Sequence, residues 1–111
     1  MRETEKIIQE FVQRLRMTRE YKLYEYSKER VRMYPGLWEQ IDEYRRKNYM
    51  LQKSEEDLFD KIDAFDREYE EFRSNPVVES YLEAEVSVCK MIREIYEQIA
   101  NAIELDIYPE L

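Results

Sequence analysis

Residues 75–103 read NPVVESYLEAEVSVCKMIREIYEQIANAI. The stretch opens on Asn75-Pro76, and asparagine is a favoured N-cap while proline suits the first turn of a helix. Apolar residues then recur every three or four positions for about eight turns. The pattern predicts one amphipathic helix that runs to about Leu105, with a length of about 45 Å. Its apolar stripe is wide enough to contact both its own chain and a second copy.

We therefore expect this helix to form an interface between copies. A small chain with such a helix commonly completes its core by self-association, because burial per residue is limited at this size. A homodimer is the structural prediction. The candidate interface residues are Leu82, Glu85, Cys89, Ile92, Tyr96 and Ile99.

Two of these residues depart from an apolar seam. Glu85 either reaches water at a rim or pairs with an arginine of another helix and fixes the register; both readings stay open. Cys89 is either a thiolate ligand or redox sensor, or a small buried apolar residue. We favour the buried residue because the chain has no second cysteine.

The upstream sequence also has helical spacing and no convincing strand pattern. A first helix is expected over about 3–17, with an apolar face at Ile7, Ile8, Phe11 and Leu15. Thr18 is a candidate N-cap for the second helix, which would carry Tyr21, Tyr24, Val31 and Tyr34 inward. Whether these two helices are continuous stays open.

Pro35-Gly36 is the clearest internal break, since proline disfavours helical geometry in the preceding residue. A third helix follows, with Leu37, Trp38, Ile41, Tyr44 and Leu51 on its apolar face. Ser54 is expected to cap a fourth helix, with Leu58, Ile62, Phe65, Tyr69 and Phe72 at heptad-like steps.

Composition supports the same architecture. The chain has 111 residues, 40% of them charged, with one glycine and three prolines. High charge with helical periodicity and few turn residues is typical of helix bundles. We predict an all-α fold: a small bundle of four to five helices with a long C-terminal helix, forming a single domain over 1–111.

The absence of histidine excludes the commonest catalytic base and transition-metal ligand. We expect no catalytic site, cofactor or metal site, and hence no enzyme. No apolar stretch approaches the roughly 18 residues of a membrane span, and the N-terminus is charged from Arg2. We therefore expect a cytoplasmic protein without membrane contacts.

Charge is uneven along the chain. Residues 1–53 carry more basic than acidic side chains, whereas the C-terminal half is strongly acidic; the net charge is -8. This balance disfavours nucleic acid through phosphate repulsion. A weak RNA-binding module that uses Arg14, Arg16, Arg19 and Lys22 is kept as an alternative.

Ten tyrosines and Trp38 are a large aromatic load. At helical spacing most of them are expected in the core, although tyrosine and tryptophan are also enriched at binding hot spots. Tyr26 lies off the inward face inferred for its helix. Together with Arg45 and Tyr49 it forms the candidate partner surface.

The Asn-Pro cap followed by VVESYLEAE resembles the YlbF/YmcA family of small bacterial helical proteins. The upstream order is also similar: an N-terminal helix, the tyrosine-bearing segment TREYKLYEY, a proline break, and a helix that ends before Asn75. The resemblance implies an all-helical, dimeric regulatory protein without known catalytic residues.

Family members act in competence, biofilm formation and sporulation, in a complex with partner proteins that modulates RNase Y and mRNA processing. The resemblance thus implies a homodimer or a heterodimer with a paralogue, and a ribonuclease-associated protein partner. Some members are linked to iron–sulfur clusters through cysteines. This chain offers only Cys89, so a metal- or cluster-linked redox sensor stands as an alternative to the regulator.

Overall fold

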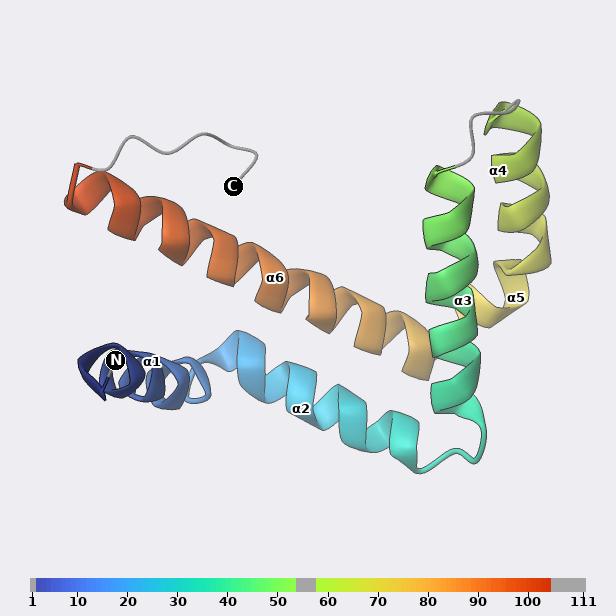
Figure 1. The fold of residues 1–111 in the computed structure, drawn as a ribbon. Helices are drawn as coiled ribbons and strands as arrows, with labels where there is room; N and C mark the ends of the chain where they lie inside the picture. The colour runs from blue at the N-terminus through green and yellow to red at the C-terminus, as the bar shows by residue number, and fades with distance from the viewer. Residues whose placement is uncertain (1, 54–57, 105–111) are drawn as a thin grey trace. The chain divides into compact units, whose positions relative to one another are not determined.

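The computed structural model describes residues 2–53 and 58–104. Within these residues it shows helices and no strand, which confirms the all-α prediction and the long C-terminal helix (Figure 1). The helices are α1 (Arg2–Leu15), α2 (Arg19–Arg32), α3 (Leu37–Gln52), α4 (Leu58–Glu68), α5 (Glu70–Ser74) and α6 (Pro76–Ala102).

Thr18 separates α1 from α2. Its hydroxyl donates a hydrogen bond to the Leu15 carbonyl at 2.6 Å and accepts one from the Tyr21 amide at 3.2 Å. One side chain therefore satisfies a free carbonyl at the end of α1 and a free amide at the start of α2. The predicted cap is confirmed, and the first two helices are separate.

Gly36 makes the turn into α3 possible. It has φ 80°, a left-handed conformation that costs side chains of L-residues steric strain, and its carbonyl accepts the Gln40 amide at 3.2 Å. The expected break at Pro35-Gly36 is confirmed. Tyr34 was expected inward but is exposed, because α2 ends at Arg32 and Tyr34 lies beyond its apolar face.

The helix expected after Ser54 is divided in two. Ser54 itself lies outside the described residues, and α4 gives way to the short α5 at Tyr69, which has φ -105° and ψ 11°. The described residues therefore form six helices rather than four or five. The Tyr69 ring contacts Phe65 on one side and Phe72 on the other, with centroids 4.8 and 5.8 Å away, and all three rings also meet Tyr44.

Asn75 begins α6 as predicted. Its side-chain oxygen accepts a hydrogen bond from the Val77 amide at 2.9 Å, and its carbonyl accepts the Glu79 amide at 2.9 Å. Pro76, which has no amide hydrogen to satisfy, is the first helical residue. The helix ends at Ala102, slightly before the predicted Leu105, and Glu104 adopts a left-handed φ of 57°.

The chain divides into two compact units: residues 25–82 form one, and residues 1–24 with 83–111 form the other. The 25–82 unit holds most of the buried side chains. In it, α3 and α4 run antiparallel to one another (Figure 1). Its largest fully buried side chains are Val31, Ile41, Val78 and Tyr81, from α2, α3 and the start of α6.

The other unit buries much less. Among its described residues only Val88 and Ala100 are buried, both on α6. α1 has no buried residue: Phe11 and Leu15 are half-buried, whereas Ile7 and Ile8 are exposed despite the expected inward face. This unit therefore presents more apolar surface than its own helices cover.

Candidate protein-binding surfaces

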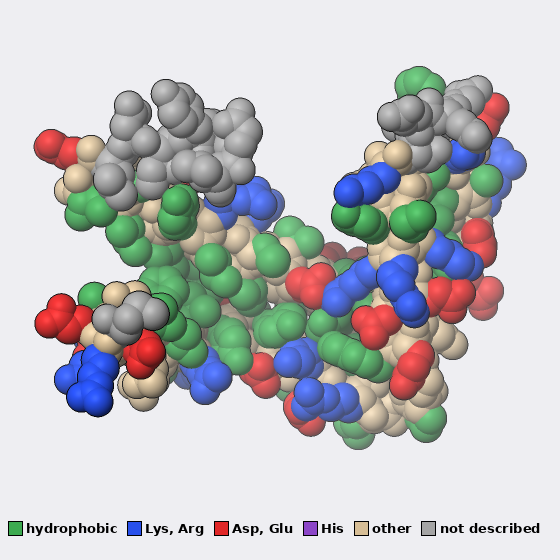
Figure 2. Space-filling view, in the orientation of Figure 1, with side chains coloured by type: hydrophobic (Ala, Val, Ile, Leu, Met, Phe, Trp, Pro, Cys, Tyr) green, Lys and Arg blue, Asp and Glu red, His purple; other side chains and the backbone are tan. Residues whose placement is uncertain are grey.

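An exposed apolar row on α6 is the main candidate site, and we call it the α6 stripe. It consists of Cys89, Ile92, Tyr96, Ile99 and Ile103, at steps of three and four residues. Such steps place the first four on one side of α6. Ile103 directly follows the last helical residue, and its amide still donates a hydrogen bond to the Ile99 carbonyl at 3.1 Å, which continues the row. The last four are 41% to 60% exposed, and Cys89 is exposed as well. Figure 2 shows apolar side chains gathered along this part of α6.

The positions beside the stripe are apolar on one edge and include one basic residue, Arg93, on the other. Helical geometry places Ile95 and Ala102 on one edge of it and Ala100 and Arg93 on the other, while Glu94 and Glu97 lie on other faces of α6. Glu94 accepts a hydrogen bond from Gln98 at 3.3 Å, within that outer face. Packing two such stripes together would bring apolar groups into contact at their centre and leave Arg93 at the edge.

The same row of residues continues toward the start of α6, where its burial differs. Val78 is fully buried in the 25–82 unit, and Leu82 and Glu85 are half-buried. From Cys89 onward the row is exposed. The expectation that Cys89 is a small buried residue is therefore wrong for the single chain: the neighbouring Val88 takes the buried position instead.

Of the candidate partner-surface residues, Tyr26 on α2 and Tyr49 on α3 are exposed. Arg45 is half-buried: its Nη2 donates a hydrogen bond to the Tyr81 hydroxyl at 3.0 Å, and its guanidinium carbon lies 5.3 Å from the centre of that ring. Tyr49 carries the Lys53 ammonium over its ring at 4.7 Å. A shared partner surface for these three residues stays a prediction.

The described residues offer no assembled metal site, since no three of their Cys, Asp or Glu side chains gather in a way that could hold a metal ion. Nor is any helix in the described part of the chain both long and apolar enough to span a membrane.

The structure has a second surface feature, which the sequence does not predict. A groove lies between α3 and α4, lined by both apolar and basic side chains. The sequence gives one indication of this groove, the mixture of basic and apolar residues in RRKNYMLQK at the end of α3. It could not be interpreted without knowing which α4 residues face it.

The chain is similar to known proteins over most of its length. Residues 5–104 match the family model described as control of competence regulator ComK, YlbF/YmcA. The chain belongs to the YlbF/YmcA family. This membership confirms the resemblance drawn from the Asn75 cap and the helix that follows it.

Two curated relatives carry the name UPF0342 protein. One, from Caldicellulosiruptor bescii, is 29% identical over 108 residues, which cover 94% of this chain and 91% of the relative. Another, from Desulfitobacterium hafniense, is 27% identical over 105 residues, which cover 91% of this chain and 84% of the relative. No solved structure matches this YlbF/YmcA chain.

Proposed function

We propose that this protein is a non-enzymatic regulator that works through protein–protein contacts and self-associates along the α6 stripe. The observation that carries the proposal is the stripe itself: five residues at heptad spacing, all exposed in the single chain. Regular apolar rows of this kind are how helices recognise other helices.

A second copy of the chain is the occupant that suits the stripe. A two-fold dimer places the same surface on both sides, so the surface must be self-complementary. The stripe meets this condition because its own residues are uncharged, and Ile95, Ala100 and Ala102 lie beside it; Arg93 is a charged residue at its edge. A paralogue with the same row would fit by the same argument.

Family membership supplies the regulatory part of the proposal. The description of the matching family model names control of the competence regulator ComK. We infer a role in the same kind of process, with competence, biofilm formation and sporulation as its setting. Modulation of RNase Y-dependent mRNA processing through a ribonuclease-associated partner is the finer form of this inference.

The oligomeric state of two variants tests whether the protein self-associates along the α6 stripe. Ile99→Lys places a charge in the centre of the proposed interface, while Asn101→Lys makes the same charge change on an exposed residue of another face of α6. Loss of Ile99 burial costs about 1–2 kcal/mol per copy and counts twice in a two-fold dimer. We expect Ile99→Lys to raise the dimer Kd by about 30- to 1000-fold, and Asn101→Lys to leave it unchanged.

Sedimentation over a micromolar concentration series measures both variants. A wild-type protein that is monomeric throughout would overturn the self-association. The regulatory part is tested separately, by affinity capture from native lysate with wild type and Ile99→Lys as baits. Capture of neither a ribonuclease-associated protein nor a paralogue by the wild type would contradict it.

A further inference from the structure

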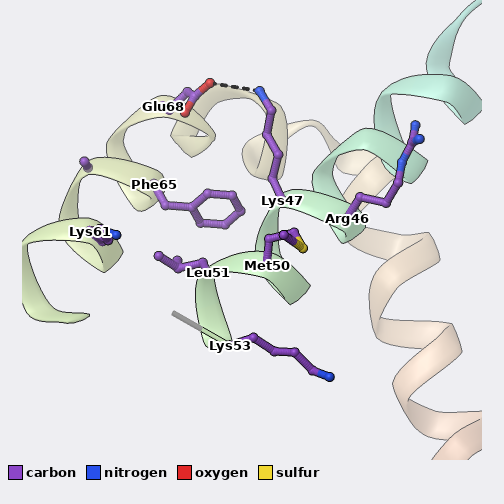
Figure 3. Close-up of a pocket in the computed structure, with 9 residues that line it drawn as sticks. Arg46, Lys47, Met50, Leu51, Lys53, Lys61, Phe65 and Glu68 are labelled. Carbon is purple, nitrogen blue, oxygen red and sulfur yellow. Dashed lines mark hydrogen bonds and ion pairs between the residues drawn. The ribbon is translucent and has the colours of Figure 1, made fainter. Parts of the chain in front are cut away.

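The groove between α3 and α4 has a volume of about 700 Å³ and lies wholly within the 25–82 unit. Its central side chains are Met50 and Leu51 from α3 and Phe65 from α4. Figure 3 shows Phe65 and Leu51 pointing into the space between the two helices, with Met50 next to Leu51 on α3. The ring of Phe65 stacks on the buried ring of Tyr44, with centroids 5.4 Å apart, and this contact fixes its position. The apolar part of the groove is therefore preformed.

The rest of the lining is mainly basic. Among the described residues, Arg46, Lys47, Lys53 and Lys61 line the groove together with one carboxylate, that of Glu68. In Figure 3 Arg46 and Lys53 extend away from Phe65 and Leu51, while the Lys47 ammonium points to Glu68. Figure 2 shows the same pattern, with apolar side chains near the end of α3 between basic ones. This local positive charge stands out in a chain whose net charge is -8.

Lys47 is paired with two carboxylates of its own chain. Its ammonium lies 3.2 Å from the Glu43 carboxylate and 3.4 Å from that of Glu68, and so joins α3 to α4 at one end of the groove. The Tyr69 hydroxyl and then the Glu43 carboxylate raise the pKa of Lys47 above its ordinary value. Lys47 therefore keeps its positive charge throughout the neutral range.

We propose that the α3–α4 groove binds an acidic amphipathic segment of a partner protein. The apolar side chains of the segment would lie on Met50, Leu51 and Phe65, and its carboxylates would meet Lys53 and Lys61. The stretch of α3 from Arg46 to Lys53 is about 10 Å long, which suits two or three turns of a helix or a shorter extended peptide.

The lining favours such a segment over other anions. A nucleic acid strand would need phosphate contacts along its length, and the acidic C-terminal half of the chain opposes it. A small inorganic anion would leave the apolar centre of the groove unfilled. A segment with both carboxylates and leucine-like side chains satisfies both parts of the lining.

The inference rests on the proposed function, because a partner-binding groove is expected only if the protein acts through protein–protein contacts. The groove and the α6 stripe are nevertheless separate groups of residues. Ile99→Lys should therefore bind the partner segment as the wild type does. If the protein is a dimer but binds no acidic segment, only the proposal for the groove is wrong. If it binds the segment but is a monomer, only the proposal for the stripe is wrong.

The probe is a fluorescein-labelled peptide of about ten residues, with leucine at every third or fourth position and Glu or Asp elsewhere. We expect micromolar binding by fluorescence anisotropy, weakened by added salt. Lys53→Glu and Lys61→Glu should each raise the Kd about tenfold, because a charge pair becomes a repulsion. Met50→Gln, an exposed position, should weaken binding without a change in charge.

Arg67→Glu is the matched control, since it makes the same charge change on α4 at a residue that does not line the groove. Circular dichroism verifies that every variant is folded. An equal loss of binding in Arg67→Glu, or no binding by the folded wild type, would overturn the proposal. Tighter binding of a labelled oligouridine or of anionic lipid vesicles than of the peptide would also overturn it.

Discussion

At the scale of single residues, Tyr81 shows how the 25–82 unit combines apolar packing with a charged side chain. Its ring is 1% exposed and meets Trp38 edge-on, with centroids 5.4 Å apart. Its hydroxyl accepts the hydrogen bond from Arg45. A half-buried guanidinium is thus held at the core by a tyrosine oxygen.

Tyr81→Phe removes only this oxygen and keeps the ring. We expect the free energy of unfolding to fall by about 1–2 kcal/mol, because hydrogen bonds to charged groups exceed the average in strength. Urea unfolding followed by circular dichroism measures the loss. Tyr26→Phe makes the same change at an exposed tyrosine and should leave stability unaltered. Equal stability of Tyr81→Phe and wild type would show that the Arg45 contact contributes nothing.

At the scale of elements, α6 depends on its first residues. The Asn75 side chain satisfies the Val77 amide, and Val77 and Val78 are both buried immediately after it. Loss of the cap would therefore loosen the turn that carries core residues. Asn75→Ala should lower the free energy of unfolding by about 1 kcal/mol, whereas Asn75→Ser should retain most of it. Thermal unfolding of the two variants compares them, and an equal loss in both would argue against capping as the cause.

The ends of most helices could be predicted because they depend on local chemistry. Thr18, Gly36 and Asn75 each satisfy or shape the backbone within a few residues of themselves, so their types alone indicate the break. The division at Tyr69 could not be predicted in this way. The rings around it all meet Tyr44, which lies on a different helix and far away in the sequence.

The candidate sites were less predictable than the helices. Val88 and Cys89 are adjacent small apolar residues on α6, and spacing alone does not say which of the two is buried. Burial depends on which face of the helix its neighbours cover. The groove was missed for a related reason, since its lining comes from both α3 and α4. Surfaces made by two elements require their packing to be known.

At the scale of the whole molecule, self-association should change the chemistry of its one thiol. Cys89 is exposed in the single chain and lies in the α6 stripe, so a dimer along the stripe would cover it. At a total concentration about 100-fold above the dimer Kd, less than a tenth of the chains are monomeric. We expect the rate of reaction with Ellman's reagent to fall about tenfold there, relative to dilute protein.

The variants assign the cause of this protection. Ile99→Lys should react at the fast rate at all concentrations, and Asn101→Lys should be protected like the wild type. Because the chain has one cysteine, the released chromophore counts Cys89 directly. Protection that persists in Ile99→Lys would mean that something other than the stripe covers the thiol. A rate that does not change with concentration in wild type, while sedimentation shows a dimer, would place the dimer interface elsewhere on the chain.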